Sequence, residues 1–196
     1  MSNIKSSKLV VMGDVSVGKT SILTRYINNT FDQFNETTIG AAFFTKKITS
    51  PTGDIINLEI WDTAGQERYD SLLPMYYRGA NIILFVFDLN NANTFNNLRS
   101  RWLDIISESG MNSIFFLVGN KSDLERNVTD ESIENLITEY DIGYFKISAK
   151  ENQGLDELFA GIINKAIECD AFKDINNLQS FASYNGTEVK RKNKCC

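Results

Sequence analysis

Residues 13–20 read Gly-Asp-Val-Ser-Val-Gly-Lys-Thr, which fits the pattern G-x-x-x-x-G-K-S/T. The octapeptide follows an apolar run, 9–12, that is typical of a buried strand, and it precedes residues 21–27, which are typical of a helix. In that context glycines let successive backbone N–H groups converge on phosphate oxygens, and the helix start adds positive potential. A chance match in an ordinary glycine turn is the alternative, which the flanking strand and helix disfavour. The pattern therefore predicts a phosphate-binding loop.

Two side chains of the loop carry the chemistry. We expect Lys19 to bring a mobile positive charge to the β and γ phosphates of a nucleotide, and the Thr20 hydroxyl to be a hard oxygen ligand for Mg²⁺.

The amino-acid composition excludes several classes of function. The 196 residues are 42% hydrophobic, which is enough for one domain with a substantial core. The absence of histidine excludes Ser-His-Asp and Cys-His hydrolysis and any His-ligated metal site within this sequence. A net charge of −5 argues against broad nucleic-acid binding. Three cysteines, two of them terminal, form no disulfide framework, so we expect a cytosolic protein.

Apolar runs alternate with segments of helical period. The later runs are almost wholly apolar, as expected where helices cover both faces of a parallel sheet, and the short turn-forming stretch 50–54 makes the second and third strands an antiparallel hairpin. The sequence therefore predicts a doubly wound α/β domain with a six-stranded, mostly parallel sheet, over residues 1–170, and a flexible tail over 171–196. The predicted strands are 8–12, 43–49, 55–61, 81–87, 114–118 and 144–147; the predicted helices are 19–28, 94–108, 130–140 and 155–169.

Asp62-Thr63-Ala64-Gly65-Gln66-Glu67 follows the third predicted strand. Beside a phosphate loop, Asp62 can hold a water of Mg²⁺, Gly65 can offer a backbone N–H to a γ-phosphate, and Gln66 can orient an attacking water. The alternative is an ordinary strand-to-loop turn with Asp62 as a cap. A threonine of the loop 37–40 is expected to complete the Mg²⁺ shell.

Asn120-Lys121-Ser122-Asp123 follows the fifth predicted strand. A carboxylate at Asp123 can accept hydrogen bonds from the N1–H and N2–H₂ groups of guanine, whereas adenine presents an acceptor at N1 and lacks the amine. Asn120 can bridge loops and reach N7, and the stem of Lys121 can cover the purine. Taken alone, such a polar tetrapeptide is more often a turn. After the sixth strand, Ala149 can offer its N–H to guanine O6.

With the phosphate loop, DTAGQE, NKSD and SAK in this order, the chain resembles the Ras superfamily of small GTPases over about residues 7–169. The stretches 61–69 and 76–80 and the terminal Cys-Cys are similar to the Rab family, and 38–43 and 73–77 are most similar to its early-endosomal group. The resemblance implies a monomeric GTP phosphohydrolase and membrane switch in endocytic vesicle traffic. It also implies binding to GTP or GDP with Mg²⁺, to effectors, to an exchange factor, to a GTPase-activating protein and to prenyl-chaperone proteins, but not to nucleic acid.

The resemblance also assigns roles by position. Switch I is then residues 30–40 and switch II residues 65–78, both ordered by the γ-phosphate. Gln66 positions the catalytic water, and Thr20, Thr38 and Asp62 serve the metal. Effectors touch Phe43, Trp61 and Tyr76, for which core packing is the alternative. The nucleotide-binding set is Val15, Ser16, Val17, Gly18, Lys19, Thr20, Ser21, Phe31, Thr38, Gly65, Asn120, Lys121, Asp123, Ser148, Ala149 and Lys150.

Val15 departs from the family pattern, because Rab proteins usually carry Ser at this position and Ras carries Gly. A branched apolar side chain beside the γ-phosphate predicts slow hydrolysis and weakened response to an activating protein, unless the loop accommodates it.

The chain ends in Cys195 and Cys196 behind four basic residues, Lys190, Arg191, Lys192 and Lys194. Rab-type Cys-Cys ends resemble substrates for double geranylgeranylation, and two lipid chains plus a basic patch anchor a protein stably to an anionic leaflet. A fortuitous cysteine pair is the alternative. The expected location is therefore the cytoplasmic face of endosomal membranes, in exchange with the cytosol.

Two other function classes remain open at this stage. A P-loop ATPase or nucleotide kinase is disfavoured by Asp123 and by the lack of an obvious lid segment. A nucleotide-bound scaffold with little turnover is kept open by Val15, and measured GTP hydrolysis separates it from a working switch.

Overall fold

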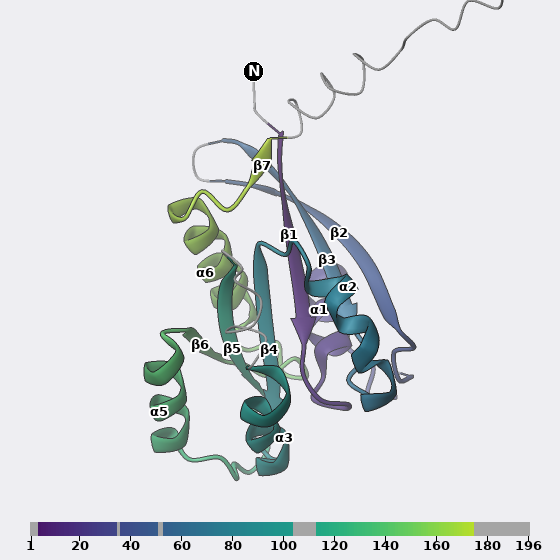
Figure 1. Ribbon diagram of the computed structural model, residues 1–196, viewed down its shortest axis with the longest axis vertical. Helices are drawn as coiled ribbons and strands as arrows, with labels where there is room; N and C mark the ends of the chain where they lie inside the picture. The colour runs from purple at the N-terminus through teal and green to yellow at the C-terminus, as the bar shows by residue number, and fades with distance from the viewer. Residues whose placement is uncertain (1–3, 35, 51–52, 104–112, 175–196) are drawn as a thin grey trace, which may run out of the picture.

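The computed structural model describes residues 4–34, 36–50, 53–103 and 113–174. A sheet runs through the centre in the strand order β2-β3-β1-β4-β5-β6, with the two-residue β7 beside β1 (Figure 1). The strands are β1 (Ile4–Met12), β2 (Ala41–Thr49), β3 (Ile55–Thr63), β4 (Ile82–Asp88), β5 (Ile114–Asn120), β6 (Gly143–Lys146) and β7 (Lys173–Asp174). The helical segments are α1 (Lys19–Asn28), η1 (Glu67–Leu72), α2 (Leu73–Tyr77), α3 (Ala92–Asn97), η2 (Leu98–Trp102), α5 (Asp130–Tyr140) and α6 (Leu155–Glu168).

The predicted sheet is confirmed. β3, β1, β4, β5 and β6 pair in parallel, whereas β2 pairs with β3 antiparallel, from Ala41 opposite Thr63 to Thr49 opposite Ile55. All seven residues of β4 are buried, as expected for a strand with helices over both faces. The carboxyl ends of the parallel strands consequently meet at one edge of the sheet, where the site lies.

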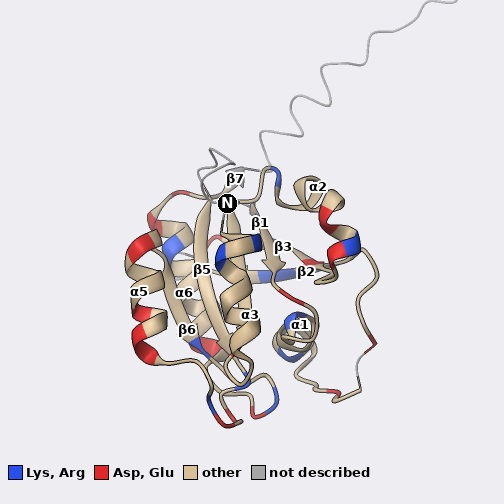
Figure 2. Cartoon of the chain, turned by 60° about the horizontal axis from the view of Figure 1, so that its bottom comes forward, with Lys and Arg blue, Asp and Glu red and all other residues tan. Residues whose placement is uncertain are grey.

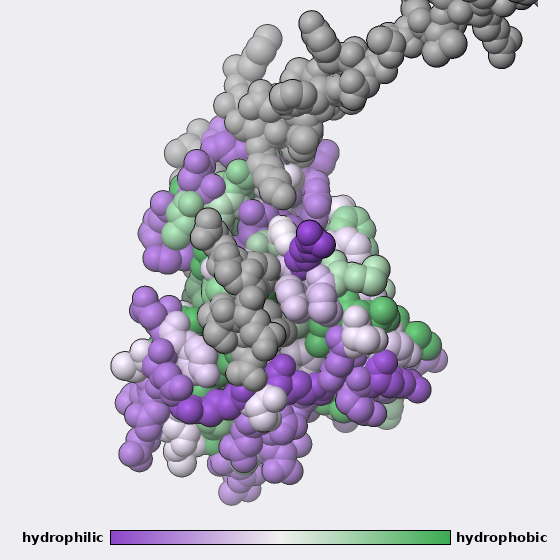
Figure 3. Space-filling view, in the orientation of Figure 1, coloured by the Kyte–Doolittle hydropathy of each residue, from purple (hydrophilic) through white to green (hydrophobic). Residues whose placement is uncertain are grey.

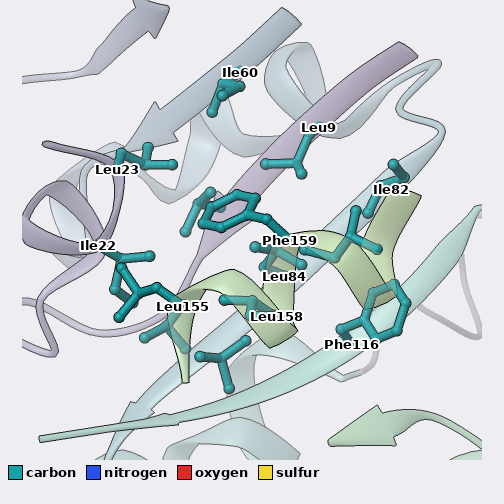
Figure 4. Packing of buried hydrophobic residues seen from close by; sticks show 14 of the residues in the cluster. Leu9, Ile22, Leu23, Ile60, Ile82, Leu84, Phe116, Leu155, Leu158 and Phe159 are labelled. Carbon is teal, nitrogen blue, oxygen red and sulfur yellow. The ribbon is translucent and has the colours of Figure 1, made fainter. Parts of the chain in front are cut away.

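Alternate residues of each strand feed two hydrophobic layers. Leu9 and Val11 of β1 face α1 and α6, where they join a cluster that includes Ile22 and Phe159 (Figure 4). Val10 and Met12 face the opposite layer, which contains Leu73 of α2, Leu98 and Trp102 of η2, and Ile133 and Leu136 of α5. This alternation follows from the two-residue period of a strand.

The predicted helix over 94–108 differs from the structure. It begins at Ala92, two residues earlier, because Asn91 accepts a hydrogen bond from the backbone N–H of Asn93 and so caps the first turn. The helix is also irregular, with α-helical α3 passing into a π-helical turn, η2. Its predicted end lies outside the described residues.

β7 was not predicted. Lys173 and Asp174 pair antiparallel with Ser6 and Lys5, so the chain after α6 returns to the amino end of β1. This end of the molecule lies opposite the carboxyl ends of the parallel strands (Figure 1). The predicted tail beyond Asp174 lies outside the described residues.

Candidate nucleotide site

A cavity of about 410 Å³ opens at the carboxyl edge of the sheet. Most of the residues that the sequence assigned to nucleotide binding lie in its wall. Those in the wall are Val15, Ser16, Gly18, Lys19, Thr20, Ser21, Phe31, Thr38, Gly65, Asn120, Lys121, Asp123, Ala149 and Lys150. Val17 and Ser148 are buried behind the wall, and the assigned residues Asp62 and Gln66 are also not among the lining residues.

The phosphate loop needs its glycines for space as well as for conformation. Gly13 adopts φ +141°, and a Cβ there would lie 2.1 Å from the carbonyl oxygen of Val86. Gly18 adopts φ +94°, and a Cβ there would lie 2.4 Å from Nδ2 of Asn120. Between them Ser16 adopts φ +64°, a left-handed conformation that is uncommon for a residue with a side chain. The loop is therefore wrapped closely, as a backbone phosphate cradle requires.

Lys19 is held inside this loop. Its Nζ donates to the carbonyl oxygens of Gly13 at 2.7 Å and Asp14 at 2.8 Å. Burial lowers the pKa of Lys19 to about 8, although Asp62 and Asp14 act in the opposite direction. An anionic phosphate beside Nζ would favour the charged ammonium, so the pocket is matched to a polyphosphate.

Three oxygen-bearing side chains meet next to Lys19. The Thr20 hydroxyl donates to Asp62 Oδ2 at 2.6 Å and lies 2.9 Å from the Thr38 hydroxyl, which is itself 3.4 Å from Asp62 Oδ2. Asp62 is fully buried, and burial raises the pKa of its carboxyl while the hydroxyls and Lys19 oppose that rise. Its second oxygen, Oδ1, is buried with no protein hydrogen-bond partner among the described residues.

These groups fit Mg²⁺. The ion takes hard oxygen ligands, keeps several waters and relies on few carboxylates plus substrate phosphates. Two hydroxyls and one buried carboxylate with a free oxygen form such a donor set, with Asp62 Oδ1 available to a metal-bound water.

Switch II begins in direct contact with the phosphate loop. A Cβ at Gly65 would lie 2.3 Å from the carbonyl carbon of Asp14 and 2.4 Å from the nitrogen of Val15, so only glycine permits this approach. Gly65 is buried and Gln66, which follows it, is half-buried. Residues 67–77 then form η1 and α2, two short helical segments that the sequence analysis did not predict.

The residues that the sequence assigned to base recognition are joined by their own hydrogen bonds. Asn120 donates from Nδ2 to the Val17 carbonyl oxygen at 2.9 Å and accepts at Oδ1 from the Ala149 N–H at 3.2 Å. It thus bridges the phosphate loop and the loop after β6. Asp123 accepts from the Ser148 hydroxyl at 2.6 Å, which fixes its carboxylate and explains why Ser148 lies behind the wall.

Several residues around the cavity were not predicted, among them Asp88, which is the partner of Lys121, and Arg25. Lys121 adopts φ +62°, and its ammonium pairs with Asp88 at 2.7 Å, which directs its stem along the cavity wall. The Arg25 guanidinium donates to the carbonyl oxygens of Ala149 and Lys150, each at 3.0 Å, and lies 5.7 Å from the centre of the Phe31 ring. The additional lining residues are Asp32, Gln33, Glu36, Thr37, Thr63 and Leu124.

Phe43, Trp61 and Tyr76 form one aromatic cluster beside the switches. The Phe43 and Trp61 rings lie 5.0 Å apart and those of Trp61 and Tyr76 5.8 Å apart. Phe43 is 51% exposed, which argues against a core role, whereas Trp61 and Tyr76 are half-buried. Hydrophobic residues gather near α2 in Figure 3, while much of the remaining face is hydrophilic.

The comparisons with known proteins agree with this geometry. The family model described as "Ras family" matches residues 8–168, which include the whole cavity wall. The fold and site therefore belong to a P-loop nucleotide hydrolase, and the chain is a member of the Ras family, within its Rab branch. As such it is a GTP phosphohydrolase.

Its relatives carry Rab5 and Ypt names. The chain is 39% identical to GTP-binding protein ypt5 of Schizosaccharomyces pombe, over 82% of this chain and 77% of that protein. It is 42% identical to putative ras-related protein Rab-5B of Dictyostelium discoideum, over 84% and 77% respectively. Ras-related protein Rab-5A of the same organism is 34% identical over 96% of this chain and 94% of its own length.

Proposed function

We propose that this Rab GTPase is a guanine-nucleotide switch that uses Mg²⁺, anchors to membranes through its tail and acts in endocytic vesicle traffic. The observation that carries the proposal is one cavity lined by a lysine-bearing phosphate loop, by the Thr20 and Thr38 hydroxyls that contact the buried Asp62, and by Asp123. The lysine and the oxygen cluster suit an anionic group that carries a metal ion. The Asp123 carboxylate suits a purine that carries hydrogen-bond donors.

The chain's own groups have distinct roles in hydrolysis. Lys19 and the N–H groups of the phosphate loop hold the phosphate oxygens and offset charge that grows in the transition state. Thr20 and Thr38 would hold Mg²⁺, with Asp62 binding one of its waters, and the ion would add charge neutralisation. Gly65 offers its N–H to the γ-phosphate, and Gln66 orients the attacking water without needing to deprotonate it strongly.

Loss of the γ-phosphate removes a partner from both switches. Thr38 then retains only its hydroxyl contacts with Thr20 and Asp62, and Gly65 loses its anion. We expect switches I and II to loosen in the diphosphate state, which changes the surface around Phe43, Trp61 and Tyr76 that effectors would touch.

Base recognition gives the most direct test. Asp123→Asn replaces an acceptor with a donor toward guanine N1–H, so we expect GTP affinity to fall by about 10³-fold or more and xanthosine triphosphate to bind instead. Competition binding with both nucleotides measures this. Asp130→Asn is a matched control, because Asp130 lies on the outer surface of α5 with its side chain 77% exposed. Unchanged GTP preference in Asp123→Asn, or ATP binding as tight as GTP in the parent, would refute guanine recognition.

Val15 sets the rate in this proposal. It lines the cavity, and its side chain is 43% exposed there. We expect Val15→Ser to raise the single-turnover rate of GTP hydrolysis severalfold, because a smaller polar side chain clears the approach of Gln66 and of an activating protein. Equal rates in parent and variant would mean that the loop accommodates valine. A parent rate near zero would instead favour a scaffold with little turnover.

The membrane part of the proposal concerns residues outside the described structure. Cys195 and Cys196 would carry two geranylgeranyl groups, and the nearby basic residues would add attraction to anionic lipids. In the described part of the chain, no helix is long and apolar enough to cross a bilayer. Unmodified thiols at both positions in membrane-bound native protein would contradict the anchor.

The endosomal location is supported by the relatives, whose names include Rab5A and Rab-5B. We propose that the protein works as a monomer on the cytoplasmic face of endosomes, cycles with the cytosol through a prenyl-chaperone, and is controlled by an exchange factor and a GTPase-activating protein. Localisation of the tagged full chain in its native cell tests the compartment.

A further inference from the structure

Arg101 occupies an irregular turn on the helical side of the site. It belongs to η2, the π-helical stretch that follows α3. Such π-helical turns are rare in proteins, and those that occur are often found at functional sites. Its guanidinium lies 4.4 Å from the centre of the buried Trp102 ring, and only 22% of its side chain is exposed. The side chain is therefore held in one direction by stacking.

The guanidinium joins three separate segments. Nη1 donates to Asp14 Oδ1 of the phosphate loop at 3.2 Å and to the Gly65 carbonyl oxygen at 3.1 Å. Nε and Nη2 donate to the two carboxylate oxygens of Asp70 in η1, at 3.1 and 2.5 Å. This paired arrangement uses the planar fork that distinguishes Arg from Lys.

The two switch II anchors lie on either side of Gln66. The Gly65 carbonyl belongs to the peptide bond whose nitrogen is that of Gln66, and Asp70 is four residues further along. One guanidinium thus fixes the backbone immediately before the water-positioning residue and the turn after it.

The phosphate-loop side of this connection is rigid. Asp14 also accepts from the indole N–H of Trp102 at 2.9 Å and from the Asn97 amide at 2.6 Å, and it is only 7% exposed. Arg101 therefore ties switch II to an immobile reference beside the phosphates, as precise positioning requires.

We propose that Arg101 is a positioning residue for GTP hydrolysis. Its guanidinium holds the backbone on both sides of Gln66 against the phosphate loop. The inference rests on the proposed water-positioning role of Gln66. Arg101 itself is not among the residues that line the nucleotide cavity. A purely structural ion-pair network would stabilise the fold without affecting the chemical step, and the two possibilities have different kinetic signatures.

The experiment measures single-turnover GTP hydrolysis and GDP dissociation in the full chain. Arg101→Ala is expected to slow hydrolysis roughly tenfold, because small displacements of a positioned group cost much of its effect, while GDP dissociation changes less than about twofold. Asp70→Ala removes only the switch II carboxylate, which is partly exposed, and keeps the test valid if Arg101→Ala folds poorly. We expect it to slow hydrolysis too, and the double variant to be no slower than Arg101→Ala.

Arg99→Ala is the matched control. Arg99 lies in the same helical turn but pairs with Glu139 on the surface, so its loss should leave hydrolysis unchanged. Hydrolysis rates within about twofold of the parent in folded Arg101→Ala and Asp70→Ala would overturn the proposal, as would strictly additive losses.

The Gln66→Leu variant distinguishes a failure of the Arg101 proposal from a failure of the proposed water-positioning role of Gln66. If Gln66 positions water, Gln66→Leu is slow and adding Arg101→Ala has no further effect. If Gln66→Leu hydrolyses GTP as fast as the parent, the role of Gln66 fails, whatever Arg101 does. If the two substitutions slow hydrolysis additively, Arg101 does not act through Gln66 and the positioning proposal is wrong.

Discussion

The base-recognition loops and the switches face the same cavity but are held in opposite ways. Asn120 and Ala149 are connected to each other and to the phosphate loop by buried hydrogen bonds, and Asp123 accepts a partly buried one from Ser148. Among the described residues of switch I, Phe34 and Ile39 are 86% and 79% exposed. We therefore expect the loops proposed to read the base to be ordered by the protein itself, and the proposed switches to depend on the ligand for order.

Arg101 gives switch II a protein contact that does not need a ligand, because it joins Gly65 to Asp14 of the phosphate loop. Switch I is held to the residue just before switch II, where the Ala64 N–H donates to the Gly40 carbonyl oxygen at 2.8 Å. Figure 2 turns the bottom of Figure 1 toward the viewer, which is the end where the parallel strands have their carboxyl ends.

Removing the bridge of the base-recognition loops should have the largest effect. Asn120→Ala leaves the Val17 carbonyl and the Ala149 N–H without their buried partner, at a cost of about 2–4 kcal/mol. We expect GDP and GTP to dissociate roughly a hundredfold faster or more, measured by release of a fluorescent nucleotide. Asn127→Ala, which removes an exposed amide bonded to the Asn90 carbonyl, is the control and should behave as the parent. A similar rate in both variants would contradict the bridging role.

A substitution at Thr38 in switch I should instead lower the affinity for the triphosphate much more than the affinity for GDP. Thr38→Ala removes one hydroxyl from the metal-binding cluster, so we expect affinity for the triphosphate with Mg²⁺ to fall about tenfold and affinity for GDP to stay within twofold. Thr38→Ser keeps the hydroxyl and should resemble the parent. Calorimetric titration with GDP and with a non-hydrolysable triphosphate measures both affinities. Equal losses for the two ligands would place Thr38 with the permanently ordered loops.

The smallest predicted effect concerns Tyr26 of α1, which packs on α6 and is not among the residues that line the cavity. Tyr26 stacks on Phe159 with ring centres 3.4 Å apart, and burial raises its pKa to about 12. Because the unfolded tyrosine ionises near pH 10, the folded state binds more protons between pH 10 and 12, and stability falls as pH rises through this window. Tyr26→Phe should remove at most about 1 kcal/mol of that loss, less than the full pKa shift would give because solvent screens the partly exposed ring, and should change stability little below pH 9. Denaturant unfolding at pH 8 and pH 11 measures the difference; parallel losses in both proteins would contradict it.

Much of the site was predictable because its residues are local in sequence or placed by strand order. The loop 13–20 is proposed to bind phosphate through its own backbone, and Asn120 ends β5 while Ala149 follows β6, two parallel strands whose carboxyl ends share one edge. Asp62 follows from the same logic at the end of β3. A pattern of strands and loops therefore suffices to bring these groups together.

The remaining contacts depend on side-chain direction over long sequence separations. Arg101 meets Asp14 across 87 positions, and Arg25 reaches Ala149 across 124. Neither connection leaves a periodic or motif-like signal, and the π-helical turn that directs Arg101 has no propensity signature. β7 is similarly invisible, because two residues carry too little pattern to predict a strand.

Amide hydrogen exchange of the GDP and triphosphate-analogue complexes tests the central comparison most directly. We predict that the triphosphate protects residues 30–40 and 65–78 well beyond the diphosphate, while residues 119–124 and 147–150 exchange identically in the two complexes. Equal protection of the switches in both states, or changes of the same size in the base-recognition loops, would contradict the account.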